Sequence, residues 1–148
     1  MKVFQKILRF ACIMTLFLCV TTVQAQSVIE KLKSNSQTTQ FARALENAGI
    51  GDRLSQPGPY TVFAPTNQTF SNLSTGQQSD SNLLLNHILT GMATVRSLRV
   101  MSDISCLSGK RISVQSSGSG LAVENNQITS PNIKANNGVI HIINGVIE

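Results

Sequence analysis

Apolar residues recur at helical spacing in the first half of the chain. Residues 28–32 carry three of them, which predicts one or two amphipathic helical turns. In residues 41–48 the apolar positions fall at i, i+4 and i+7, and they predict a helix that Thr38 or Thr39 caps and Gly49 ends. This part of the sequence is typical of short helices that share one core.

A strand is predicted directly after these helices. Residues 50–54 predict one more helical turn, and Pro57-Gly58-Pro59 then breaks the helical pattern. Residues 60–64 are rich in β-branched and aromatic side chains, which favours a strand, and Pro65 ends it.

The segment that follows returns to helical spacing. Thr66 is placed to cap a short helix over residues 67–73, and the polar residues 74–81 predict an exposed loop. A further helix, capped by Asp80 or Ser81, is predicted by the apolar residues of one face. These residues are Leu84, Leu85, Ile88 and Leu89.

The second half changes to the period of strands. Three strands are predicted, over residues 112–114, 121–123 and 139–143. Residues 116–120 and 125–126 have turn chemistry, and Asn137-Gly138 is the strongest hairpin signal in the chain because such pairs adopt positive φ readily. Helices followed by hairpins predict an α+β fold with a mostly antiparallel sheet.

The first 25 residues have the layout of a cleavable secretory signal. Lys2, Lys6 and Arg9 precede an apolar run over residues 10–20, and Ala25 closes a small-residue exit. The run is shorter than the roughly 20 apolar residues that cross a bilayer, so we expect no integral membrane anchor. So short a signal is typical of bacteria. We therefore expect residues 26–148 to form a single secreted or periplasmic domain.

Charge and cysteine content reduce the number of functions that the sequence supports. Removal of the signal takes three of the 12 basic residues and none of the seven acidic ones, which leaves a net charge of +2. Only Lys110-Arg111 forms a basic pair, so nucleic-acid binding has little support. Cys106 is the single cysteine of residues 26–148, and we expect it to be a buried apolar side chain.

The sequence offers little catalytic chemistry. It contains no G-x-S-x-G, H-E-x-x-H, paired-cysteine or phosphate-loop motif, so we expect no catalytic residues, metal or cofactor. His87 and His141 are the two side chains that titrate near neutral pH. We expect both to be structural, with His87 hydrogen-bonded to a backbone group near Thr90 or Gly91.

Three blocks of the sequence, taken in order, resemble the fasciclin domain of secreted adhesion proteins. The first block is residues 44–70, which is similar to the family pattern T-V-F-A-P-T-x-x-A-F. Its matching positions are Thr61, Phe63, Pro65, Thr66 and Phe70.

The other two blocks lie in the second half. Asn86 and His87 stand at the family's central tyrosine–histidine motif, with Asn86 in place of the usual tyrosine. Asn137, Gly138 and His141 fit the closing pattern N-G-V-I-H-V-I-D-x-V-L. The resemblance implies a fasciclin-like wedge of two β-sheets with N-terminal helices packed beside it.

The resemblance also implies an extracellular adhesion module without enzymatic activity. We expect a monomer that binds a protein or polysaccharide surface ligand through exposed loops and a sheet edge. Two alternatives remain: a structural envelope or stress-related protein, and a small hydrolase that uses His87 with a nearby serine. If the chain is an adhesion module, the family-motif residues either stabilise its fold or contact its ligand.

Overall fold

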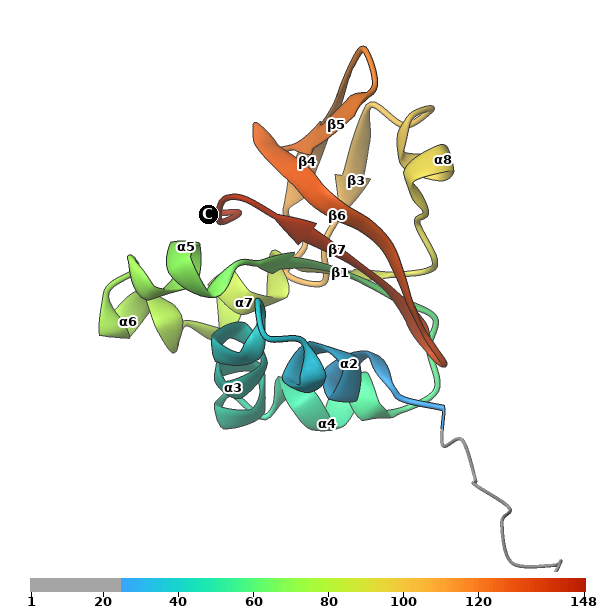
Figure 1. Ribbon diagram of the computed structural model, residues 1–148. Helices are drawn as coiled ribbons and strands as arrows, with labels where there is room; N and C mark the ends of the chain where they lie inside the picture. Colours follow the sequence, from blue (N-terminus) through green and yellow to red (C-terminus); the bar gives the residue numbers. More distant parts are fainter. Residues whose placement is uncertain (1–24) are drawn as a thin grey trace, which may run out of the picture.

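The computed structural model describes residues 25–148, in which helices α2 to α7 gather at one side of a twisted sheet and α8 lies apart from them (Figure 1). The predicted signal peptide, apart from Ala25, lies outside the described residues. The helices are α2 (Val28–Ser34), α3 (Thr39–Asn47), α4 (Ile50–Ser55), α5 (Asn67–Ser71), α6 (Thr75–Gln78), α7 (Ser81–Leu85) and α8 (Val95–Leu98). The strands are β1 (Tyr60–Pro65), β2 (Ile88–Thr90), β3 (Asp103–Ser105), β4 (Arg111–Ser117), β5 (Gly120–Val123), β6 (Asn126–Ala135) and β7 (Gly138–Ile143). Within residues 25–148 no helix is both long and apolar enough to cross a membrane.

Helices α2 to α4 form the helical group that the apolar spacing predicts. Ser27 and Glu30 close a capping box at the start of α2. Thr38 precedes α3 without capping it, because its hydroxyl donates to the carbonyl of Leu32 at 2.8 Å and so ties α3 to α2. Gly49 has a φ of +74°, a conformation open to glycine, and it turns the chain from α3 into α4.

The strand β1 ends in the predicted strand-to-helix corner. Pro65 is its last residue, and the hydroxyl of Thr66 accepts a hydrogen bond from the N–H of Thr69 at 3.4 Å, which caps α5. Phe70 of α5 is buried and packs edge-on against Phe41 of α3, with 5.7 Å between the ring centroids. The corner thus fixes α5 to the helical group.

Two predictions for residues 74–89 were wrong. The expected loop contains helix α6, which Ser74 and Gln77 begin with a capping box. The next helix is capped by Asp80 as expected, but it ends at Leu85. Residues 88–90 form β2, because pairing with β1 outweighs the helical spacing of their side chains.

The seven strands form one mixed, nearly barrel-like sheet in the order β2-β1-β7-β6-β5-β4-β3. Strands β1 and β7 are parallel, with Phe63 beside His141, and the other neighbouring pairs are antiparallel. The N–H of Leu107, after β3, donates to the carbonyl of Ile88 in β2 at 2.8 Å and brings the sheet's ends together. The prediction of α+β structure is confirmed, whereas the expected two-sheet wedge is one continuous sheet.

The hairpins of the second half lie where turn chemistry predicts them. Gly118 has a φ of +57° in the β4–β5 turn, and Glu124 and Asn125 have φ values of +48° and +64° in the β5–β6 turn. Residues 104–107 alternate like a strand in the sequence, and β3 covers Asp103–Ser105. The sequence did not predict β2, β6 or α8. Strand β2 has three residues, too few to show a period, and β6 alternates polar with apolar residues irregularly around Pro131.

The role expected for Asn137-Gly138 needs correction. The pair does stand at the β6–β7 hairpin, but within residues 25–148 neither residue is among those with positive φ. Gly138 is required for a different reason: a Cβ atom there would collide with the backbone carbonyl of Tyr60 on the adjacent parallel strand. Close approach of two backbones, rather than turn geometry, selects glycine at this position.

Two clusters of buried side chains hold the layers together. Phe70 belongs to the cluster between the helices and β1, and Phe63 belongs to the cluster enclosed by the sheet and α8. Both rings are buried, as predicted. Cys106 is also buried, and burial raises the pKa of its thiol to about 11, so it is a weak nucleophile at neutral pH.

Candidate binding site

His87 lies between α7 and β2 and is fully buried. Its Nδ1 atom donates to the carbonyl of Leu83 at 2.9 Å, and its Nε2 atom accepts the N–H of Ile147 at 3.0 Å. The expected partner near Thr90 or Gly91 was wrong, because the ring points back along α7. Burial lowers the pKa of His87 to about 4, so the imidazole is neutral at physiological pH.

Asn86 ties the same two segments together. Its amide nitrogen donates to the carbonyl of Ile147 at 3.4 Å, and its carbonyl oxygen accepts the hydroxyl hydrogen of Ser108 at 2.6 Å. With His87, this side chain holds Ile147 by both its N–H and its C=O groups. Asn86 therefore has an internal structural function.

His141 is buried in β7 and is held in the opposite tautomer. Its Nε2 atom donates to the carbonyl of Ala93 at 2.7 Å, and its Nδ1 atom accepts the N–H of Asn132 at 3.1 Å. The ring stacks on Phe63 with 5.6 Å between centroids. Burial lowers the pKa of His141, while the Ala93 carbonyl opposes that shift.

Thr61 holds the same connecting segment as His141. Its hydroxyl donates to the carbonyl of Gly91 at 2.7 Å and accepts the N–H of Ala93 at 2.8 Å. Thr61 and His141 therefore hold Ala93, between β2 and α8, by both its N–H and its C=O groups. His87 shares no hydrogen-bond partner with them, so the structure divides the motif residues into two separate groups.

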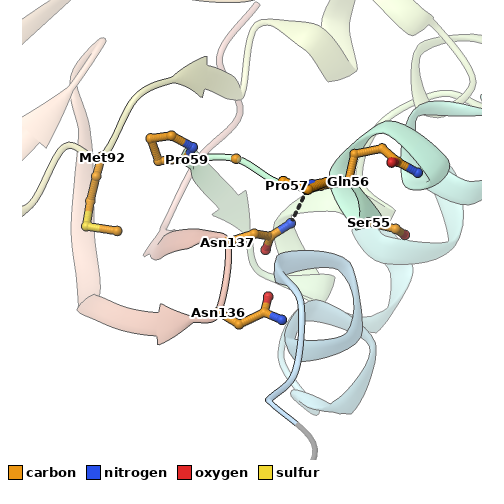
Figure 2. Close-up of a pocket in the computed structure, with 8 residues that line it drawn as sticks. Ser55, Gln56, Pro57, Pro59, Met92, Asn136 and Asn137 are labelled. Carbon is orange, nitrogen blue, oxygen red and sulfur yellow. Dashed lines mark hydrogen bonds between the residues drawn. The ribbon is translucent and has the colours of Figure 1, made fainter.

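Asn137 joins the helical group to the sheet. Its side-chain oxygen accepts the N–H of Val28 at 2.8 Å, and its nitrogen donates to the carbonyls of Leu54 and Gln56 at 2.7 and 2.8 Å. Figure 2 shows this side chain pointing toward Gln56. A single amide thus satisfies one backbone group of α2, one of α4 and one of the residue that follows α4, which explains why asparagine occupies the position.

A groove of about 480 Å³ lies beside this amide (Figure 2). None of the described residues that line it is charged, so it offers amide groups, backbone and apolar surface. Its lining residues are Ser55, Gln56, Pro57, Gly58, Pro59, Met92, Asn136 and Asn137. Met92 leaves 56% of its surface exposed at the rim, where an apolar side chain is free to contact a partner. We call this surface the Asn137 groove.

Within residues 25–148 no group of three or more histidine, cysteine or acidic side chains is placed to hold a metal ion. Sequence reasoning missed Met92 and Asn136, because an exposed methionine and a loop asparagine have no period or motif that distinguishes them. The prolines at 57 and 59 were the one available signal of a rigid loop at this place.

The chain is similar to fasciclin-domain proteins over most of its length. The sequence profile of the fasciclin domain matches residues 36–148. The uncharacterized protein sll1735 of Synechocystis is 30% identical over 129 residues, which cover 82% of this chain and 96% of that protein. Transforming growth factor-beta-induced protein ig-h3 of Sus scrofa is 28% identical over 130 residues, and this chain spans 19% of its length.

A solved structure shares the fold. A FAS1 domain pair from the insect cell adhesion molecule fasciclin I superposes with a TM-score of 0.69 at 15% identity, over 83% of this chain and 51% of that one. The chain belongs to the fasciclin domain family.

Proposed function

We propose that this chain is a secreted or periplasmic binding module that attaches to a protein or polysaccharide surface and performs no bond chemistry. The fold neighbour is described as a cell adhesion molecule, which supports a role of the same class here. We further propose that the module acts as a monomer.

The proposal rests mainly on one observation, which is that both histidine rings form their hydrogen bonds within the protein. His87 and His141 are buried, and each ring has both nitrogen atoms bonded to backbone groups of the same chain. A general base must reach a proton on its substrate. The hydrolase hypothesis depended on His87, whose nitrogen atoms face Leu83 and Ile147 instead of solvent.

The Asn137 groove is the contact surface that we propose for this function. Its floor is rigid because the Asn137 amide bonds to both α2 and α4 residues. Met92 supplies exposed apolar area at the rim, and apolar contact surrounded by polar groups is typical of recognition sites. The uncharged lining suits a partner that binds by shape and amide hydrogen bonds.

Binding of the exported protein to immobilised cells, matrix proteins and polysaccharides tests the proposal. We expect saturable binding to at least one of these surfaces, and about tenfold weaker binding for Met92→Asp, because a charge at an apolar contact must be desolvated. Val100→Asp is the matched control, since Val100 is 85% exposed and does not line the groove. The absence of saturable binding to every surface, with the protein folded, would contradict the proposal.

A further inference from the structure

A second groove, of about 400 Å³, lies between α3 and the α5–α6 segment. Helix α3 contributes Gln40, Arg43, Ala44 and Asn47, at i, i+3, i+4 and i+7, which is one face of the helix. The opposite wall carries Thr75 and Gln78 of α6 together with Ser79, again at helical spacing. Ala48 and the buried Phe70 complete the lining.

Arg43 is the one charged side chain among the described residues that line this groove, and it is exposed. Among the described residues its guanidinium has neither a hydrogen bond nor a salt bridge. Glu46, three residues further along α3, pairs with Lys33 at 2.8 Å. Asp80, which follows the α6 wall, accepts the N–H of Asn82 at 2.9 Å. The groove therefore presents a cation that the neighbouring carboxylates do not neutralise.

The remaining polar groups are amides and hydroxyls. Gln78 donates its amide hydrogens to the carbonyls of Phe70 and Leu73, at 3.3 and 2.9 Å, which leaves its oxygen as an acceptor. Gln40 and Asn47 present further amides from the facing helix. Amides that both donate and accept match the hydroxyl groups of a sugar, and a guanidinium binds a carboxylate through two parallel hydrogen bonds.

A peptide fits this groove less well. Both walls are helical, so the described part of the chain offers no free strand edge in this groove to which an extended peptide could add. Acidic peptide motifs are usually bound by several arginines, and this groove contains one. One cation among many hydroxyl-binding groups corresponds to a polymer with one carboxylate and several hydroxyls per unit.

We propose that the α3–α6 groove binds an acidic polysaccharide by holding the carboxylate of a uronic acid unit on Arg43 and sugar hydroxyls on the surrounding amides. The inference rests on the proposed binding function and assigns a ligand class to a site separate from the Asn137 groove. The two sites are distinguishable because they share no residue.

Calorimetric titration of the exported protein with a galacturonic acid hexamer tests the proposal. We expect saturable binding that Arg43→Gln weakens about tenfold or more, because a charge-assisted contact is lost. Arg43→Lys retains the charge without the planar fork and should bind with intermediate affinity. Thr75→Trp keeps Arg43 and fills the groove from α6, so it should also weaken binding.

Three controls make the result specific. Arg96→Gln removes an exposed arginine from α8, at the opposite side of the molecule from α6 (Figure 1), and should leave hexamer binding unchanged. Met92→Asp should also leave it unchanged, since Met92 lines the other groove. The methyl-esterified hexamer, which lacks the carboxylate charge, should bind the wild type as weakly as the acidic hexamer binds Arg43→Gln.

Each contrary outcome overturns the inference in a recognisable way. No saturable hexamer binding by a wild type that still attaches to another surface would refute the uronate site and leave the proposed function standing. If Arg96→Gln lost as much affinity for the hexamer as Arg43→Gln, binding would be due to nonspecific electrostatic attraction. A hexaglutamate peptide that binds as tightly as the hexamer would replace the polysaccharide with an acidic peptide. Melting curves of each variant show that the fold is intact.

Discussion

His87 accepts the backbone N–H of Ile147 on its Nε2 atom at 3.0 Å, across 60 positions of the sequence. The side chain of Ile147 is itself fully buried in the sheet cluster, and Asn86 holds its carbonyl. The end of α7 therefore fastens the segment that follows the last strand. A motif that lies near the middle of the chain stabilises the packing of its final residues.

Replacement of His87 by alanine should lower the free energy of unfolding by about 1–3 kcal/mol. The substitution leaves the buried N–H of Ile147 and the carbonyl of Leu83 without partners, which is the usual cost of an unpaired buried group. Urea unfolding measures the change. Gln68→Ala, at an exposed position on α5, serves as the control and should stay within about 0.5 kcal/mol of the wild type.

The stability of the protein should fall as the pH drops from about 6.5 to about 4. The pKa of His87 is lowered from 6.5 to about 4 in the folded state, so in this window the unfolded chain binds a proton that the folded chain does not. The contribution of His87 to the free energy of unfolding is complete above pH 6.5. It amounts to roughly 3 kcal/mol, because each pH unit by which the pKa is lowered corresponds to about 1.4 kcal/mol. The lowered pKa of His141 acts in the same direction.

Urea midpoints at pH 7.5, 6, 5 and 4 measure this dependence. His87→Gln removes the titrating group and should flatten the curve, leaving the smaller contribution of His141. Equal midpoints for the wild type at pH 7.5 and pH 5 would show that His87 is not held neutral by burial.

Asn137→Ala should destabilise the protein by about 1–3 kcal/mol, since it removes the partner of the Val28 N–H and of the Leu54 and Gln56 carbonyls. Asn137→Asp keeps the acceptor for Val28 but cannot donate, and it places a carboxylate against two carbonyl oxygens. We expect it to be at least as destabilising as alanine at neutral pH. Thermal unfolding of both variants checks this, and a melting temperature within a degree of wild type would contradict the assigned role.

Gly138→Ala and Gly76→Ala should differ sharply. A Cβ at Gly138 collides with the Tyr60 carbonyl on the neighbouring strand, so the β1–β7 pairing has to open. A Cβ at Gly76, in helix α6, meets no atom within 4 Å, and alanine there should be neutral or stabilise by up to about 1 kcal/mol. Circular dichroism during heating separates the two outcomes, and equal melting temperatures would refute the close-approach explanation.

The parts of the fold that follow from local pattern were predictable from the sequence. The helical spacing of residues 28–48, the corner at Pro65 and Thr66, and the turns around Gly118 and Asn125 all agree with the structure. Ile88 and Leu89 were misassigned, because their helical spacing is real and only pairing with β1 makes them a strand.

The partners of the motif residues could not be predicted in the same way. Nothing in the sequence near His87 indicates Ile147, and nothing near Asn137 indicates Val28 or Leu54, since these contacts depend on how distant segments pack. The grooves were beyond prediction for a related reason. Each is formed by short segments whose side chains gain a common surface only after the helices and the sheet have assembled.

We infer that the family-motif residues hold the fold while separate exposed surfaces bind. Parallel measurement of melting temperature and surface binding for His87→Ala and Met92→Asp tests it most directly. We expect a lower melting temperature for His87→Ala with binding that follows the folded fraction, and an unchanged melting temperature for Met92→Asp with weakened binding. A His87→Ala protein that melts like the wild type and no longer binds would contradict it.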